Sequence, residues 1–312
     1  MNSTPMSTPK LLYSTANYEY LAGELAERGG FERGAIERKT FPDGELYQRV
    51  LGEPWGRDVV LLGGTPTDLD WLELYDLGCA LSRGGARSLS IAMPYFGYST
   101  MERAVKRGEV VTAKTRARLI SAIPACEGGT RTFLFDLHTD GIEFYFSDNH
   151  VTHHVYGASL VIEIVKALGR GRELVLGATD AGRAKWVESL ARDIGCAPAF
   201  VYKRRDPDSG GLSITGVNAD VDGKVVVLYD DMIRTGSSLL QAARAYRHAG
   251  AIEVHAVASH LVLPGDALER LTSSGLIDSV NGTNSHPGSA KVGDRGTVAS
   301  CAELFARELM RS

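Results

Sequence analysis

Cysteine is scarce in this sequence, and none of the four residues lies in a CxxC pair. Cys79, Cys126, Cys196 and Cys301 are far apart, which argues against a zinc site or a disulfide framework and fits a reducing cytoplasm. No apolar run approaches the roughly 20 residues of a membrane span, and the polar segment Met1–Pro9 lacks the apolar core of a signal peptide. We therefore expect a cytoplasmic protein with no membrane partner.

An excess of basic residues is also missing. The net charge of -4 gives no reason to expect nucleic acid as a partner. The apolar content of 44% and the charged content of 23% are average for a soluble globular protein. A chain of 312 residues is long enough for two domains of ordinary size with a large buried core.

Short apolar strands alternate with helical segments along the whole chain. This alternation predicts an α/β fold with mostly parallel, doubly wound sheets. The pattern restarts near residues 155–157, so we predict two similar α/β domains, 1–156 and 157–312. The last segment, about residues 288–312, is expected to pack back on the first domain. The clearest predicted strands are Lys10–Thr15, Asp58–Gly63, Ser88–Met93, Phe133–His138, Glu173–Gly177, Ala199–Tyr202, Leu212–Val217 and Val254–Val262.

The most informative stretch is an apolar strand followed by a loop of small residues. Val225–Leu228 is an unbroken apolar run typical of a strand buried on both faces, and Asp230 and Asp231 follow it. The loop 235–238 then opens a helix. Such a loop presents backbone N–H groups and a positive dipole end to an anion, so it predicts a phosphate cradle.

The two carboxylates should point in different directions, because side chains alternate along a strand. Separately aimed, Asp230 and Asp231 suit the hydroxyls of a sugar phosphate better than one shared metal ion. The alternative interpretation is an acidic strand end followed by a helix that Ser237 or Ser238 caps. The stretch is neither a Walker loop nor a dinucleotide fingerprint.

Three further polar groups could carry chemistry. His138 and Asp180 each follow a strand and could help to hold Mg²⁺, although a lone histidine is often a hydrogen-bonded structural residue. The cationic run 203–205 is either a solvated charge cluster or a loop that stabilises a transferring phosphoryl group. The turn at Pro42–Gly44, with its alternating flanks, predicts a hairpin.

Six blocks of the sequence resemble, in order and spacing, those of ribose-phosphate pyrophosphokinases, the PRPP synthetases. The loop after Asp230 alone would also resemble type I phosphoribosyltransferases. The blocks are Phe41-Pro42-Asp43-Gly44-Glu45, Pro94-Tyr95-Phe96-Gly97-Tyr98 with Thr112-Ala113-Lys114, Asp136-Leu137-His138, Thr179-Asp180-Ala181-Gly182, Lys203-Arg204-Arg205 and Asp230-Asp231-Met232-Ile233-Arg234-Thr235-Gly236.

The resemblance implies two domains of the type I phosphoribosyltransferase kind. It also implies a diphosphokinase that converts Mg-ATP and ribose 5-phosphate to PRPP and AMP, in a homo-oligomer whose nucleotide site is shared between subunits. The residues that it implies are Lys203 and Arg205 for catalysis; His138 and Asp180 for Mg²⁺; Phe41, Asp43, Gly44, Glu45 and Glu102 for the nucleotide; and Asp230, Asp231, Arg234, Thr235, Gly236, Ser237 and Ser238 for ribose 5-phosphate.

The sequence departs from the common family pattern at several of these positions. Thr100-Met101 replaces the Arg-Gln that contacts the nucleotide, and Arg234 replaces an Asp. The run Glu102–Lys114 and the segment Thr283–Pro287 are closer to the class of the family known from plants. Two alternatives therefore stay open, namely a non-catalytic subunit associated with a PRPP synthetase and a phosphoribosyltransferase.

Overall fold

The computed structural model describes residues 8–179, 184–205 and 212–312, which form two compact units. Unit 1 contains the chain up to Tyr156 together with Cys301–Ser312, and unit 2 contains Gly157–Ser300. The segment that returns to unit 1 is thus shorter than the stretch from about residue 288 expected from the sequence. None of the helices in these residues combines the length and apolar character needed to cross a lipid bilayer.

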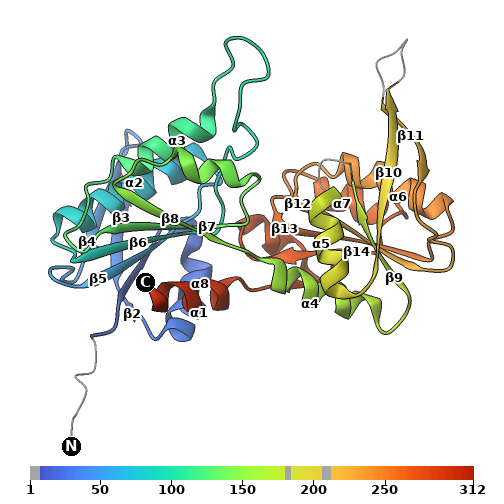
Figure 1. Cartoon of the computed structure of the whole chain (residues 1–312). Coiled ribbons are helices and arrows are strands. Elements are labelled where there is room, and N and C mark those ends of the chain that lie inside the picture. Colours follow the sequence, from blue (N-terminus) through green and yellow to red (C-terminus); the bar gives the residue numbers. More distant parts are fainter. Residues whose placement is uncertain (1–7, 180–183, 206–211) are drawn as a thin grey trace, which may run out of the picture. The chain divides into compact units, whose positions relative to one another are not determined.

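Unit 1 is built on a six-stranded sheet in which every pair of neighbours is parallel, in the order β2-β1-β5-β6-β7-β8. Helices α2 and α3 cover one face, and α1 and α8 cover the other (Figure 1). A separate antiparallel hairpin, β3–β4, lies beside this sheet. The elements are β1 (Leu11–Ser14), α1 (Glu19–Gly29), β2 (Glu32–Arg33), β3 (Ala35–Thr40), β4 (Leu46–Leu51), β5 (Asp58–Leu62), α2 (Asp68–Arg83), β6 (Ser88–Met93), α3 (Thr112–Ser121), β7 (Thr130–Phe135), η2 (Asp140–Tyr145), β8 (His150–Val155) and α8 (Ala302–Arg311).

Unit 2 has a seven-stranded sheet in the order β11-β10-β9-β12-β13-β14-β15. Its neighbours are parallel except for the antiparallel pair β10–β11. The elements are α4 (Ala158–Gly169), β9 (Leu174–Ala178), α5 (Ala184–Ile194), β10 (Ala197–Arg205), β11 (Leu212–Val217), β12 (Val225–Ile233), α6 (Ser237–His248), β13 (Glu253–Leu261), α7 (Ala267–Ser273), β14 (Ser279–Thr283), η4 (Pro287–Lys291) and β15 (Val298–Ala299).

The two sheets share one winding order. If β11 is set aside, the strands of each sheet lie in the chain order 2-1-3-4-5-6. Strand β5 and helix α2 of unit 1 therefore occupy the place that β12 and α6 occupy in unit 2. The predicted fold class, an α/β protein with doubly wound, mostly parallel sheets, is confirmed.

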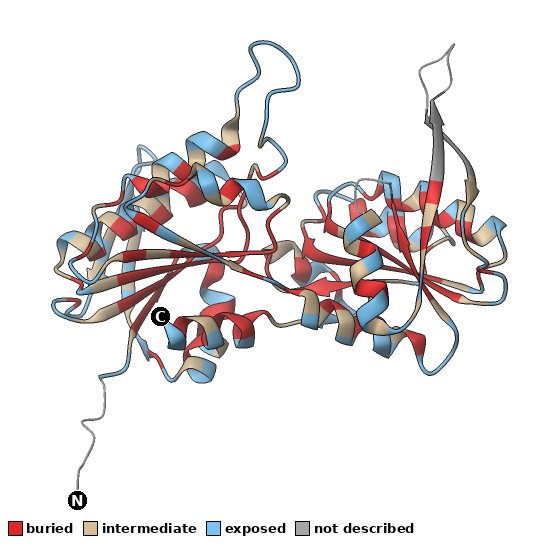
Figure 2. Ribbon diagram, viewed as in Figure 1, coloured by how far each residue is buried: buried red, intermediate tan, exposed pale blue. Residues whose placement is uncertain are grey.

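Strand β12 shows why an apolar run marks the centre of such a sheet (Figure 2). Val226 and Leu228 pack in the cluster that includes side chains of α6 and α7. Val227 and Tyr229 point to the other face and pack in the cluster formed with α4 and α5. Burying each such aliphatic side chain stabilises the fold by about 1.5–3 kcal/mol relative to leaving it exposed, so both faces require apolar residues.

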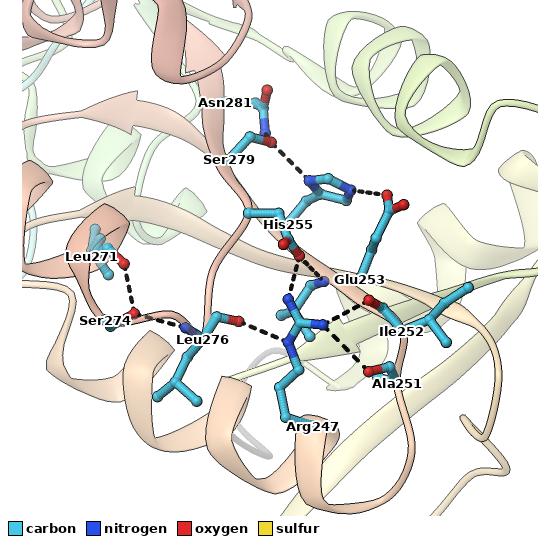
Figure 3. Close-up of polar contacts among 12 residues, drawn as sticks. Arg247, Ala251, Ile252, Glu253, His255, Leu271, Ser274, Leu276, Ser279 and Asn281 are labelled. Carbon is cyan, nitrogen blue, oxygen red and sulfur yellow. Dashed lines mark hydrogen bonds and ion pairs between the residues drawn. The ribbon is translucent and has the colours of Figure 1, made fainter.

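A polar network anchors the carboxyl end of α6 where strands β13 and β14 begin, which is the end of the sheet opposite to Asp230 and the loop 235–238 (Figure 3). The Arg247 guanidinium donates hydrogen bonds to the carboxylate of Asp278 and to three backbone carbonyls, those of Ala251, Ile252 and Leu276. The His255 ring lies between the Ser279 hydroxyl, 2.8 Å from Nδ1, and the Glu253 carboxylate, 3.1 Å from Nε2. These contacts fix the carboxyl end of α6 and leave its amino end at the other edge.

Several elements were not predicted from the sequence. Strand β8 has polar residues at four of its six positions, and β14 is short and contains Asn and Gly, so neither has the pattern of a buried strand. Strand β7 also ends earlier than predicted. It stops at Phe135 because Asp136 adopts a left-handed backbone conformation, with φ at 38°, which turns the chain away from the sheet.

The central position of β12 makes a stability prediction. Leu228 is fully buried, so Leu228→Ala should lower the free energy of unfolding of unit 2 by about 2–5 kcal/mol. Chemical denaturation followed by tryptophan fluorescence measures this: Trp186, whose ring stacks on Tyr229 at 4.5 Å between centroids, reports on unit 2, while Trp55 and Trp71 belong to unit 1. Ile252→Ala is the control, since Ile252 is 50% exposed and its loss should cost below about 1 kcal/mol. Equal effects would contradict the packing described here.

Candidate active site

The predicted phosphate cradle lies between the carboxyl end of β12 and the first turn of α6. Gly236, at the N-cap, has φ at 74°, and no side chain caps this helix. The residue that caps the helix is therefore neither Ser237 nor Ser238, contrary to the alternative interpretation. Thr235, Ser237 and Ser238 are exposed around this buried glycine. The first N–H groups of a helix have no partner within the helix, so the exposed loop can receive an anion.

The equivalent helix of unit 1 has a different amino end. At the start of α2, the Asp70 carboxylate accepts hydrogen bonds from the backbone N–H of Thr67 at 2.8 Å and from the Thr67 hydroxyl at 2.6 Å. The Asn17 side chain donates to the other oxygen of Asp70 at 2.6 Å. A carboxylate of the protein itself thus occupies this helix start, whereas the first turn of α6 contains no acidic residue. Of these two equivalent helix starts, the one in unit 2 is the better suited to an external phosphate.

The two carboxylates of β12 lie in different environments, as their alternation predicts. Asp231 is buried, while Asp230 is partly exposed at the carboxyl edge. The Asp230 carboxylate accepts two hydrogen bonds. The Thr179 hydroxyl donates to Oδ2 of Asp230 at 3.1 Å, and the backbone N–H of Asp231 donates to Oδ1 of Asp230 at 2.9 Å. These contacts fix the Asp230 carboxylate at the sheet edge, where it can accept hydrogen bonds from hydroxyl groups.

Helix α7 packs against the predicted cradle and holds its backbone in place. Arg270 donates a hydrogen bond to the backbone carbonyl of Thr235 at 3.1 Å. A Cβ atom added to Gly236 would lie 2.6 Å from Cδ2 of Leu271, so this close approach and the positive φ both require glycine. Arg234 is exposed beside the loop and adds a positive charge next to it.

The segment that departs from the family pattern, Thr283–Pro287, closes the same edge of the sheet. The Ser285 hydroxyl donates to the carbonyl of Ser259 at 3.0 Å, so it must accept from Nδ1 of His260, which lies 2.8 Å away. Nδ1 of His286 accepts from the backbone N–H of Gly288 at 2.9 Å. Burial lowers the pKa of His286 to about 4, so this ring is neutral near pH 7.

The predicted metal residue His138 lies three residues beyond the end of β7, in a turn that the neighbouring strand holds. The backbone N–H of Leu137 donates to Nε2 of His154 at 3.1 Å. Burial lowers the pKa of His154, which keeps Nε2 available as an acceptor. His138 itself is partly exposed.

The hairpin residues predicted for the nucleotide are all exposed at the tip between β3 and β4. Gly44 has φ at 93° in the turn, and the N–H of Glu45 donates to the Asp43 carboxylate at 3.2 Å. The Lys39 ammonium lies 5.2 Å from the centroid of the Phe41 ring. The tip therefore presents two carboxylates and an aromatic ring to solvent.

Glu102, the fifth residue predicted for the nucleotide, lies on the connection between β6 and α3. Its backbone carbonyl accepts a hydrogen bond from the Tyr145 hydroxyl at 2.5 Å, and its carboxylate pairs with Arg103 at 3.3 Å. The backbone of the replaced pair Thr100-Met101 is also held in place, because the N–H of Met101 donates to the carbonyl of Tyr98 at 2.8 Å.

The remaining predicted residues are only partly covered by the structure. Asp180 lies outside the described residues. Lys203 and Arg205 lie on strand β10, where the structure describes their backbone but not their side chains. Strand β10 pairs with β9 only as far as Phe200, and beyond it continues as a two-stranded ribbon with β11, with a register irregularity at 202/203 (Figure 1).

No three His, Cys, Asp or Glu side chains gather around a common point in the part of the chain that the structure describes. Mg²⁺ in nucleotide-using enzymes is commonly held by one or two carboxylates together with substrate phosphates. The predicted ligand His138 has Asp136 and Asp140 within two residues of it in the sequence, and Mg²⁺ binding at this turn stays a prediction.

Sequence reasoning missed the residues that support the site. His154 contacts the turn before His138, and Arg270 and Leu271 lie against the loop 235–238; none of the three carries a motif of its own. The sequence does offer one signal, because residues 150, 153 and 154 place three histidines within five positions. That density is unusual for a strand and could have drawn attention to β8.

Comparisons with known proteins decide the family. Residues 10–123 match the N-terminal domain of ribose phosphate pyrophosphokinase, and residues 190–298 match the phosphoribosyl synthetase-associated domain. A ribose-phosphate pyrophosphokinase of Fusobacterium nucleatum is 31% identical over 305 residues, which cover 97% of this chain and 94% of the relative. The chain belongs to the ribose-phosphate pyrophosphokinase family.

Other pyrophosphokinases agree with this assignment. A relative from Synechococcus elongatus is 33% identical over 88% of this chain and 82% of its own length. The crystal structure of a phosphoribosylpyrophosphate synthetase from Mycobacterium smegmatis matches with a TM-score of 0.85 at 27% identity, covering 97% of this chain and 98% of that one. The pyrophosphokinase fold therefore extends over both units.

The cradle makes a prediction about anion binding. Gly236→Ala should weaken the binding of ribose 5-phosphate at least about tenfold, because the new Cβ forces the loop away from Leu271. Gly223→Ala is the matched control, since Gly223 has a similar φ of 68° but no atom within 4 Å of an added Cβ. Titration calorimetry measures both affinities. Equal weakening in the two variants would show that general backbone strain, and not the cradle, is responsible.

Proposed function

We propose that this pyrophosphokinase transfers the β,γ-diphosphoryl group of ATP to O1 of ribose 5-phosphate, giving PRPP and AMP. The observation that carries the proposal is the uncapped start of α6, with Asp230 beside it, in a chain that matches family members over nearly its whole length. The two units provide separate places for the two substrates.

Ribose 5-phosphate binds at the carboxyl edge of unit 2. Its phosphate lies on the loop of Thr235, Gly236, Ser237 and Ser238, where N–H groups, hydroxyls and the positive end of the α6 dipole favour a dianion. The ribose hydroxyls lie near the carboxylates of Asp230 and Asp231. Arg234 adds a cation beside the phosphate, at a position where most of the family has an aspartate.

The transfer itself is a displacement at the β-phosphorus. The anomeric oxygen forms a bond to Pβ and loses its proton to solvent, while the bond from Pβ to the oxygen shared with Pα breaks and releases AMP. Lys203 and Arg205, at the far end of β10, stabilise the charge that spreads over the transferring group. Most of the acceleration comes from positioning and electrostatics, since no covalent intermediate is needed.

The nucleotide is bound as its Mg²⁺ complex. His138 and Asp180 help to hold the ion, which neutralises phosphate charge when it is bound. Phe41, Asp43, Gly44, Glu45 and Glu102 contact the nucleotide. The hairpin tip contributes to the site of a neighbouring subunit in a homo-oligomer, and its exposure in the single chain supports this arrangement.

We further assign the chain to the divergent class of the family known from plants. The run Glu102–Lys114 and the segment Thr283–Pro287 support that assignment. A cytoplasmic location is supported by the four cysteines, all of which are free thiols.

Incubation of the purified protein with Mg-ATP and ribose 5-phosphate tests the reaction. We expect AMP and PRPP in equal amounts, measured by ion-exchange chromatography over a range of phosphate concentrations. Absence of AMP under all of these conditions would contradict the proposal. Base-dependent release of pyrophosphate from PRPP would instead identify a phosphoribosyltransferase, and tight co-purification of an inactive chain with an active synthetase would identify a regulatory subunit.

The role of Lys203 can be tested separately. Lys203→Ala should lower kcat at least about 100-fold and change the Kd of ribose 5-phosphate less than about threefold, because the ammonium acts on the transferring group. Lys224→Ala is the control, since Lys224 pairs with Asp220 and Glu173 at the opposite edge of the sheet. Stopped-time assays give kcat and calorimetry gives Kd. Equal losses in both quantities would mean that the loop only binds substrate.

A further inference from the structure

A histidine from the neighbouring strand holds the turn that leads to His138. Nε2 of His154, on β8, accepts the backbone N–H of Leu137 at 3.1 Å. The residue before it, Asp136, has φ at 38°, and its N–H donates to the carbonyl of Val155 at 3.1 Å. Residues other than glycine remain in this conformation only where their surroundings hold them. Two of the contacts that hold the turn therefore come from β8.

The His154 ring is itself fixed in one orientation. Its side chain is 6% exposed, and the ring stacks on Tyr156 with 3.9 Å between centroids. Because Nε2 accepts a hydrogen bond, the neutral ring carries its proton on Nδ1. Nδ1 lies 3.2 Å from Oδ1 of Asp140, close enough for attraction although the angle is not that of a hydrogen bond. The carboxylate thus favours the tautomer that leaves Nε2 free to accept.

We propose that His154 is a positioning residue of the nucleotide site: by accepting the Leu137 N–H it sets the direction in which His138 leaves the sheet. The inference rests on the proposed function, in which His138 meets the metal complex of ATP. Residues that orient a metal-contacting group typically change affinity or activity by about 10–100-fold when they are replaced.

The adjacent residue, His153, shows that the contact with the turn before His138 is made from one face of β8. Side chains of a strand alternate, so His153 points to the other face, where it stacks on Phe133 at 4.8 Å between centroids. His153 and His154 carry the same ring one position apart, and only His154 faces the turn. The pair therefore supplies its own matched control.

Two substitutions separate the acceptor from the shape of the ring. His154→Phe keeps a flat ring that can stack on Tyr156 but removes the acceptor, and His154→Gln keeps an acceptor, its amide oxygen, at a similar reach. His153→Phe is the control. Titration calorimetry of each full-length variant gives the Kd of the Mg²⁺ complex of a non-hydrolysable ATP analogue and the Kd of ribose 5-phosphate.

We expect His154→Phe to weaken binding of the ATP analogue about 10–100-fold, with His154→Gln and His153→Phe within about threefold of the wild type. The Kd of ribose 5-phosphate should stay within about threefold in all variants, because its cradle belongs to unit 2. If His154→Phe does not fold, His154→Leu takes its place. Equal weakening by Gln and Phe, unchanged binding in the Phe variant, or parallel loss of ribose 5-phosphate binding would overturn the proposal.

The same data separate this inference from the proposed reaction. Analogue binding needs no turnover, so a wild-type protein that binds the analogue but forms no AMP contradicts the reaction, while the variants still decide the role of His154. A wild-type protein that binds no analogue at all contradicts both.

Discussion

The amino end of helix α6 is the feature on which the proposed phosphate cradle depends. A left-handed glycine begins the helix, no side chain caps it, and the first turn contains no carboxylate. Backbone N–H groups at such a position need a partner, and water or an anionic ligand is the available choice. The buried strand β12, the brace from Arg270 and the packing of Leu271 against Gly236 keep these groups in place.

The two units use one winding order for different purposes. In unit 1, Asp70 satisfies the helix start that corresponds to the cradle, so that position is closed to phosphate. The proposed nucleotide residue His138 of unit 1 instead follows the turn after β7, where Asp136 leaves the sheet in a left-handed conformation. The repeated fold thus differs at this helix start, which a carboxylate of the chain occupies in unit 1 and which no side chain caps in unit 2.

The sequence predicted those features that depend on neighbours along the chain. The strand and the helix start around the predicted cradle could be inferred directly, because an apolar strand, two aspartates and a run of small residues follow one another from Val225 to Ser238, while phosphate binding there stays a prediction. The glycine N-cap was not predicted, since Ser237 and Ser238 are better capping residues by type. Packing against Leu271 favours glycine at that point, and α7 lies more than thirty residues further along the chain.

The support of His138 was beyond local reasoning for a similar reason. The contact between His154 and Leu137 joins two parallel strands, and its formation depends on the register that pairs Phe135 with Val155. No local pattern encodes that register, because β8 is largely polar on the face that would normally mark a strand. The left-handed conformation of Asp136 is likewise a product of the finished sheet.

The return of the chain to unit 1 has a consequence for biosynthesis. Helix α8 buries Phe305 against the same face of the sheet as α1, yet these residues follow the whole of unit 2. A ribosome adding about 5–20 residues per second needs on the order of ten seconds to make unit 2. During that interval the sheet of unit 1 lacks the cover of α8 on one apolar face. Unit 2 can therefore complete its fold before unit 1 does. A nascent chain stalled before Cys301 would be the form most in need of a chaperone.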